Sequence, residues 1–180
     1  MIHDDHVNLL RPAHLAPGGN WADLGAGSGA FTLALRDLLG PQAEIYAVDK
    51  DRARLSELEE AYRGRFGDLT KLHVLPADFT RGLVLPVLDG VLMANSLHYM
   101  KDKEKILGRL RGYLKAQGAL LLVEYNVDSG NPWVPYPVSF RSFESLAPRA
   151  GFGRPRLLST HPSTFLREFY SALSLKDDPG

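Results

Sequence analysis

The chain has 180 residues, 44% of them apolar, which is enough to bury one sizeable hydrophobic core, so we expect a single domain over residues 1–180. Acidic and basic residues balance at 21 each, and this neutrality disfavours DNA and RNA as partners because no net positive charge attracts a polyanion. The chain has no cysteine, which excludes disulfides, thiolate metal ligands and a cysteine nucleophile.

The amino-terminal segment, residues 1–16, is expected to be helical. It begins MIHDDHVNLLRP, which lacks the apolar stretch of a signal peptide, and no window of the chain approaches the roughly 20 apolar residues of a membrane span. We therefore expect a cytoplasmic protein without membrane insertion. His3, His6, Asp4 and Asp5 superficially resemble metal ligands, but they lie beside a terminus without a third, distant partner, so no metal site is expected.

Short apolar runs alternate with longer amphipathic runs over residues 20–126, which is the pattern of strands separated by helices in a mostly parallel sheet. The predicted strands are 20–24, 44–49, a run that starts at Lys71, 89–96 and 119–126. The last of these, ALLLVEYN, is apolar over most of its length, as expected of a strand that is buried on both faces.

Three helices are predicted between these strands, because apolar residues recur there with the helical period. The first has its apolar stripe at Phe31, Ala34, Leu35 and Leu38 and stops at Gly40 and Pro41. The second is capped by Asp51 and carries Leu55, Leu58 and Tyr62. The third carries Ile106, Leu107, Leu110, Tyr113 and Leu114 and should end at Gly118.

The last third of the chain changes in character. Residues 127–138 hold three prolines and two large aromatic side chains, in a connection that is long for a turn between a strand and a helix. We interpret this loop as a lid, or as a contact between two copies of the chain. A short helix is expected over 142–150. The runs 155–160 and 168–175, separated by a polar stretch with Pro162, should pair as antiparallel strands.

A glycine-rich turn, ADLGAGSGAF, lies between the first predicted strand and the first predicted helix. Gly25, Gly27 and Gly29 leave room for a ligand to approach backbone amides at the carboxyl edge of the sheet. Asp49 ends the second strand, where a carboxylate can accept hydrogen bonds from the vicinal hydroxyls of a ribose. Dinucleotide sites and purely structural corners use similar glycine turns, so this motif alone leaves the ligand open.

Several motifs together carry a family resemblance. ADLGAGSGAF, YAVDKD, PADF and DGVLMANSLHYM, followed by GALLLVEYN and a terminal antiparallel pair, resemble the class I S-adenosylmethionine-dependent methyltransferases. The resemblance implies an α/β fold with a Rossmann-like, doubly wound, seven-stranded sheet of order 3-2-1-4-5-7-6, strand 7 antiparallel. NSLHYM and SFESLAPRAGF are similar to the branch of the family that acts on small molecules and quinone precursors.

The resemblance also implies S-adenosylmethionine as the cofactor and S-adenosylhomocysteine as the product. It assigns cofactor binding to Asp23, Gly25, Ala26, Gly27, Gly29, Asp49, Lys50, Asp78, Phe79 and Asn95. In this assignment Asp49 binds the ribose, Asp78 and Phe79 read the adenine, and Asn95 stands where backbone groups hold the methionyl ammonium. In related enzymes the amino-terminal helix covers the cofactor, which would place His6 beside it.

The candidate catalytic residues are His98 and Tyr99, which follow the fourth predicted strand. His98 is either a general base for an acidic acceptor or an imidazole that shapes the acceptor pocket, and Tyr99 has the same two interpretations. Trp133 and Tyr136 either form an aromatic wall for a flat acceptor or anchor their loop on the core.

The resemblance predicts an enzyme that moves a methyl group to O, N or C of a small molecule by in-line displacement, as a monomer or a homodimer. A methyltransferase that acts on protein or RNA is one alternative. A non-catalytic module that binds S-adenosylmethionine or S-adenosylhomocysteine is a second, and an NAD-dependent oxidoreductase is a third.

Overall fold

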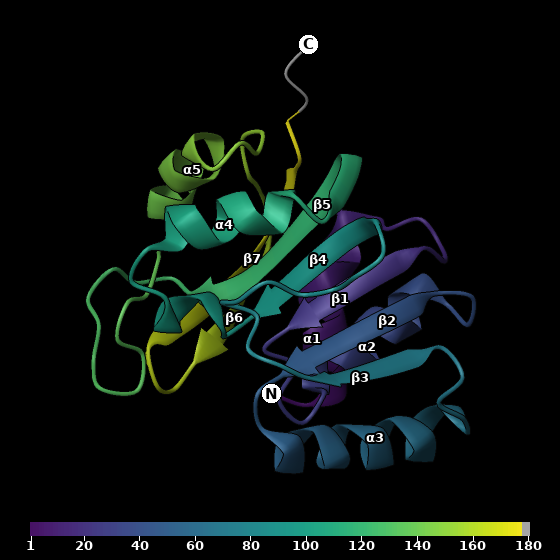
Figure 1. The fold of residues 1–180 in the computed structure, drawn as a ribbon. Coiled ribbons are helices and arrows are strands. Elements are labelled where there is room, and N and C mark those ends of the chain that lie inside the picture. The colour runs from purple at the N-terminus through teal and green to yellow at the C-terminus, as the bar shows by residue number, and fades with distance from the viewer. Residues whose placement is uncertain (178–180) are drawn as a thin grey trace.

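The computed structural model describes residues 1–177, and its centre is one sheet of seven strands. The strands are β1 (Asn20–Leu24), β2 (Glu44–Asp49), β3 (Leu72–Pro76), β4 (Leu88–Ala94), β5 (Leu114–Tyr125), β6 (Arg156–Ser163) and β7 (Arg167–Leu175). Their order is β3-β2-β1-β4-β5-β7-β6, and β7 runs antiparallel to both of its neighbours (Figure 1). The predicted fold class, strand order and antiparallel strand are therefore confirmed. The end of the predicted domain, 178–180, lies outside the described residues.

Helices cover both faces of the sheet (Figure 1). They are α1 (His3–Leu10), η1 (Arg11–Ala13), α2 (Ala30–Leu39), α3 (Arg52–Phe66), η2 (Leu97–Tyr99), α4 (Lys103–Arg111) and α5 (Phe140–Arg149). One hydrophobic cluster joins α1, α2 and α3 to one face, and a second joins α4 and α5 to the other. No helix among residues 1–177 is both long and apolar enough to cross a membrane.

The central strand β5 shows why a continuously apolar run is needed in this position. Leu120 and Leu122 are buried in the cluster under α4 and α5, whereas Leu121 and Val123 are buried in the cluster under α1 to α3. Since successive side chains of a strand point to opposite faces, a strand with helices on both sides has no solvent face for polar residues.

Side-chain caps fix where three of the helices begin. The Asp51 carboxylate accepts hydrogen bonds from the backbone N–H groups of Ala53 and Arg54 at the start of α3. Asp102 accepts one from Lys105 in α4, and Ser139 accepts one from Ser142 in α5. These caps satisfy backbone donors that have no partner inside the helix. The predicted cap at Asp51 is present.

The predicted end of the third helix at Gly118 is wrong. Helix α4 ends at Arg111, and β5 begins three residues later at Leu114, which pairs with Leu88 of β4. Leu114 is buried, as predicted, but it is buried as a residue of strand β5 and not on the apolar face of a helix. Over a single helical turn, the spacing of apolar residues does not distinguish burial on a helix face from burial in a strand.

Smaller differences occur near the carboxyl terminus. Helix α5 begins at Phe140 because Ser139 provides the cap, two residues before the predicted start. Strand β6 continues to Ser163 and includes Pro162, which was expected in the connection. β6 is an edge strand of the sheet, and proline is tolerated there because one side of the strand needs no ladder donor.

Candidate functional site

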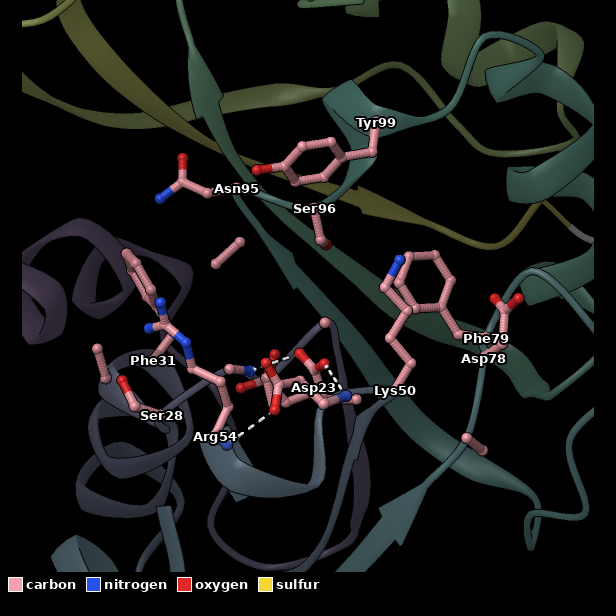
Figure 2. A pocket seen from close by; sticks show the side chains of 18 of the residues that line it. Asp23, Ser28, Phe31, Lys50, Arg54, Asp78, Phe79, Asn95, Ser96 and Tyr99 are labelled. Atoms are coloured by element: carbon pink, nitrogen blue, oxygen red, sulfur yellow. Dashed lines mark hydrogen bonds between the residues drawn. The ribbon is translucent and has the colours of Figure 1, made fainter. Parts of the chain in front are cut away.

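A cavity of about 640 Å³ lies at the carboxyl ends of β1, β2 and β4. This is the size expected of a small-molecule site and the edge where doubly wound sheets bind ligands. Figure 2 shows Asn95, Ser96 and Tyr99 along one wall and Asp23 and Arg54 opposite them. All of the predicted site residues line this cavity except Gly29 and His98.

The glycine turn after β1 needs glycine for two separate reasons. Gly25 has φ +82°, and a Cβ there would lie 2.5 Å from Cβ of Ser96, so both backbone conformation and space exclude a side chain. Gly27 has φ +53°, and a Cβ there would meet no protein atom within 4 Å. Because Gly27 lines the cavity, this open side leaves the backbone accessible to a ligand.

Asp49, at the end of β2, ties the glycine turn to the neighbouring strand. Its Oδ2 accepts the N–H of Gly27 at 2.8 Å and its Oδ1 accepts the N–H of Asp51 at 2.9 Å. A carboxylate offers about four acceptor positions, so about two remain for a ligand. The spare positions suit a pair of vicinal hydroxyls.

Asp23 is a buried carboxyl group in which one oxygen has no hydrogen-bond partner. Its Oδ2 accepts the hydroxyl of Thr32 at 2.6 Å, whereas Oδ1 is buried without a hydrogen-bond partner. Burial raises the pKa of Asp23 to about 7; the Thr32 hydroxyl opposes this rise and the nearby Asp49 charge adds to it. An unpartnered buried acceptor in a cavity wall favours a ligand that donates a hydrogen bond.

Asn95 presents a second unpartnered acceptor to the same cavity. It follows β4 with a left-handed backbone, φ +54°, and its own N–H donates to the carbonyl of Val123 at 2.9 Å. Its side-chain Oδ1 is buried and has no partner. Asn95 and Asp23 each line the cavity and each carry a buried acceptor without a partner, and such acceptors fit a ligand that donates hydrogen bonds, as an ammonium group does.

The far end of the cavity is formed by the segment after β3. Oδ1 of Asp78 accepts both the backbone N–H and the hydroxyl of Thr80, and these bonds lower the pKa of Asp78, with smaller contributions from Arg81 and Lys50. Phe79 is buried beside the glycine turn. An ionised acceptor next to an apolar ring face fits a flat base that carries an amino group.

Gly29 and His98 lie off the cavity wall. Gly29 precedes α2 with φ +89°, and a Cβ there would lie 2.6 Å from Cγ of Leu58, so this glycine allows α2 and α3 to pack closely. The His98 side chain is buried, and its Nδ1 lies 2.7 Å from Oε2 of Glu124. The other Glu124 oxygen accepts the backbone N–H of His98 at 3.1 Å.

Some residues of the site were missed in the sequence. Thr32 and Ser96 carry no distinctive signal, because only the fold brings them to Asp23 and to the carbonyl of Leu24. Glu124 did carry one, since it is a carboxylate inside the apolar run ALLLVEYN and its side chain is fully buried. An ionisable residue in such a strand needs a partner, and His98 is that partner.

The amino-terminal helix contributes to the site as well. His6 lines the cavity and packs its ring edge-on against Phe31, with 4.7 Å between ring centroids. Burial lowers the pKa of His6, with smaller contributions from neighbouring positive groups, so its imidazole is neutral near pH 7. His3 instead contacts Asp37 at 2.6 Å. Within residues 1–177, no group of three or more potential ligands could hold a metal ion.

Comparison with known proteins identifies methyltransferases as relatives of this chain. Residues 22–120, more than half of the chain, match the family described as "Methyltransferase domain". (S)-Coclaurine N-methyltransferase of Thalictrum flavum subsp. glaucum is 29% identical over 113 residues, which is 63% of this chain and 30% of that protein. The ubiquinone/menaquinone biosynthesis C-methyltransferase UbiE of Burkholderia mallei is 29% identical over 121 residues, 65% of this chain and 47% of that protein. The matched part of the chain therefore spans less than half the length of these curated relatives.

A solved structure extends the comparison to the fold. An SAM-dependent methyltransferase from Aquifex aeolicus superposes with a TM-score of 0.74 at 20% sequence identity. The match covers 96% of this chain and 89% of that one. The two chains therefore share one fold over nearly their whole lengths.

Proposed function

The chain belongs to the methyltransferase domain family, and from this premise we propose that it is an S-adenosylmethionine-dependent enzyme that methylates O, N or C of a small acceptor molecule. The observation that carries the proposal is the set of unused acceptors in the cavity. Asp23 Oδ1 and Asn95 Oδ1 are buried without partners, and Asp49 keeps acceptor positions free. These groups match the ammonium and the ribose hydroxyls of S-adenosylmethionine.

We assign each part of the cofactor to a set of residues along the cavity. Asp23 and Asn95 would accept from the methionyl ammonium, next to the open glycine turn at Gly27. Asp49 would accept from the ribose, and Asp78 with Phe79 would hold the adenine. Lys50 also lines the cavity beside Asp78.

The chemistry we propose is direct displacement. When bound, the cofactor supplies a methyl group on a cationic sulfur, which an acceptor atom can attack without a metal. The contribution of this chain is then to hold donor and acceptor in line and to exclude water. Such positioning contributes on the order of 7 to 11 kcal/mol in intramolecular reactions.

His98 serves this positioning in the proposed mechanism. Glu124 holds both its imidazole and its backbone N–H, and thereby fixes the short helix η2 that carries Tyr99 to the cavity wall. We therefore assign His98 to holding Tyr99 in place, since His98 itself does not line the cavity.

Calorimetric titration with S-adenosylmethionine and with S-adenosylhomocysteine tests the proposal. We expect binding in the micromolar range and its loss in Asp49→Ala. Asp68→Ala is the matched control, because Asp68 is an exposed carboxylate in the turn before β3 and does not line the cavity. A folded protein that binds neither compound would refute the assignment. Binding would lead to a screen of small acceptors by methyl transfer, and binding without turnover would indicate a sensor module.

A further inference from the structure

A group of aromatic rings continues the cavity wall beyond Tyr99. We call Tyr99, Tyr125, Trp133 and Phe165 the aromatic face. His98 lies between the two tyrosines, with its ring centroid 4.4 Å from that of Tyr99 and 6.1 Å from that of Tyr125. The Tyr125 and Phe165 centroids are 5.9 Å apart, and those of Phe165 and Trp133 are 6.3 Å apart. Phe165 therefore joins Tyr125 and Trp133 directly, and Tyr99 is linked to Tyr125 through the buried ring of His98.

These rings come from four separate segments of the chain. Tyr99 belongs to η2, Tyr125 ends β5, Trp133 lies in loop 127–139, and Phe165 lies in the turn between β6 and β7. Figure 1 shows that η2, this loop and this turn lie at the edge toward which β4 and β5 point. Folding thus gathers large apolar side chains from distant parts of the sequence at one place.

The aromatic face is exposed although its rings are large and apolar. Trp133 is 70% exposed, Tyr99 56% and Phe165 49%. Contiguous apolar surface of this kind on a folded chain marks a binding site more often than isolated exposed residues do. The rings are also held in position: Tyr136 donates its N–H to the carbonyl of His98 at 2.9 Å, and Asn131 Oδ1 accepts the N–H of Trp133.

The aromatic face is continuous with the proposed cofactor cavity. Tyr99 belongs to both, because it lines the cavity and contacts His98. In Figure 2 the Tyr99 ring lies above Ser96, and its hydroxyl points toward Asn95. A molecule on the aromatic face would therefore reach the cavity at the end where the proposed methionyl part lies.

The chemistry of the face is mostly apolar, with three polar points. None of its four side chains carries a charge at neutral pH, and its polar groups are the hydroxyls of Tyr99 and Tyr125 and the indole N–H of Trp133. Burial raises the pKa of Tyr125, and the nearby Glu124 and Tyr99 raise it further. The Tyr125 hydroxyl therefore stays protonated and can donate a hydrogen bond.

We propose that the aromatic face is the acceptor subsite and that it takes an uncharged, planar ring with a polar substituent. The ring would pack against Trp133 and Phe165, since aromatic rings favour offset or edge-to-face contacts with one another. The substituent would lie at the tyrosine hydroxyls, next to the cavity. This inference rests on the proposed function and adds the class of acceptor to it.

The chain contains its own reporter for the test. It has two tryptophans, Trp21 and Trp133, and Trp21 is buried on β1 at 4% exposure. Heteronuclear NMR therefore gives two indole N–H signals, and Trp133→Phe assigns them. In the presence of S-adenosylhomocysteine, β-naphthol should shift the Trp133 signal strongly and leave the Trp21 signal in place. Decalol, its saturated and non-planar counterpart, should produce no comparable shift.

Variants then test the individual rings. Phe165→Ala and Trp133→Ala should each weaken β-naphthol binding about three- to tenfold, the range expected for the loss of one aromatic contact. Both should leave S-adenosylhomocysteine affinity unchanged. Val87→Ala is the control, because Val87 is an exposed apolar residue that precedes β4 at the opposite edge of the sheet.

Three results would overturn the inference. The first is equal binding of β-naphthol and decalol, and the second is binding that neither Phe165→Ala nor Trp133→Ala alters. The third is a dimer in solution that dissociates in Trp133→Ala, because the face would then be a contact between copies of the chain. Failure of S-adenosylhomocysteine to bind would instead refute the proposed function. The indole N–H signals recorded with β-naphthol alone would then show separately whether the aromatic face binds a planar ring.

Discussion

The raised pKa of Asp23 predicts a specific dependence of stability on pH. The group has a pKa of about 7 in the folded chain and 3.8 as its ordinary value. Between these two pH values the unfolded chain loses the proton and the folded chain keeps it, so Asp23 lowers the free energy of unfolding progressively as pH rises. A gap of about 3 pH units corresponds to roughly 4 kcal/mol. This cost is absent near pH 4 and complete above about pH 7.

The matched perturbation is Asp23→Asn, which keeps the shape and an oxygen that accepts the Thr32 hydroxyl but cannot ionise. Near pH 4 the variant and the parent should have similar free energies of unfolding. Above about pH 7 the variant should be more stable by up to roughly 4 kcal/mol in the absence of ligand. Urea unfolding at several pH values between these limits measures the difference directly.

A second variant, at Asp68, checks the predicted direction in which stability changes with pH. Hydrogen bonds from the Thr70 side chain and backbone lower the pKa of Asp68, so its carboxylate contributes stability above its ordinary pKa and loses that contribution as pH falls. Asp68→Asn should therefore be slightly less stable than the parent at neutral pH and equal to it in acid, the opposite course from Asp23→Asn. A stability difference for Asp23→Asn that stays constant across the range would refute the reasoning.

Two further substitutions test the architecture around the cavity. Gly25→Ala should destabilise the fold by about 2 kcal/mol or more, because it combines left-handed strain with a 2.5 Å approach to Ser96, and calorimetry should show weaker cofactor binding. Glu124→Ala should cost on the order of 3 kcal/mol in chemical unfolding, since it leaves the Nδ1–H and backbone N–H of His98 without an acceptor. Glu124→Gln retains one acceptor oxygen and should cost less, and equal stability of all three chains would contradict this role.

The strand order could be predicted because the family resemblance implied it, and the motifs that carry this resemblance are local in the sequence. The glycine turn at 25–29, the acidic residue at the end of β2 and the continuous apolar run of β5 each identify their element without knowledge of the others. The end of α4 could not be predicted, because Leu114 is apolar for a reason that lies outside its own segment. It pairs with Leu88, and only the assembled sheet shows this.

The same distinction applies to the candidate site. The glycine turn after β1 and Asp49 at the end of β2 were placed at the ligand site from their positions at strand ends, since parallel strands bring their carboxyl ends to one edge. The residues that follow β3 and β4 were placed there by the family resemblance. The contact between His98 and Glu124 was not foreseen. It joins two strand ends 26 residues apart, and nothing in NSLHYM indicates that its histidine points away from the cavity.

The two halves of the proposed active site therefore differ in how they are encoded. The cofactor half consists of turns that follow β1 to β4, and the short motifs in these turns together carry the family resemblance. The acceptor half depends on contacts between η2, the end of β5, loop 127–139 and the turn before β7, and its residues Trp133 and Phe165 meet only in the folded chain. Substitutions in this second half can change the acceptor while the cofactor motifs stay intact. For this reason the family of the chain can be recognised from its motifs, whereas its acceptor has to be inferred from the arrangement of the aromatic face.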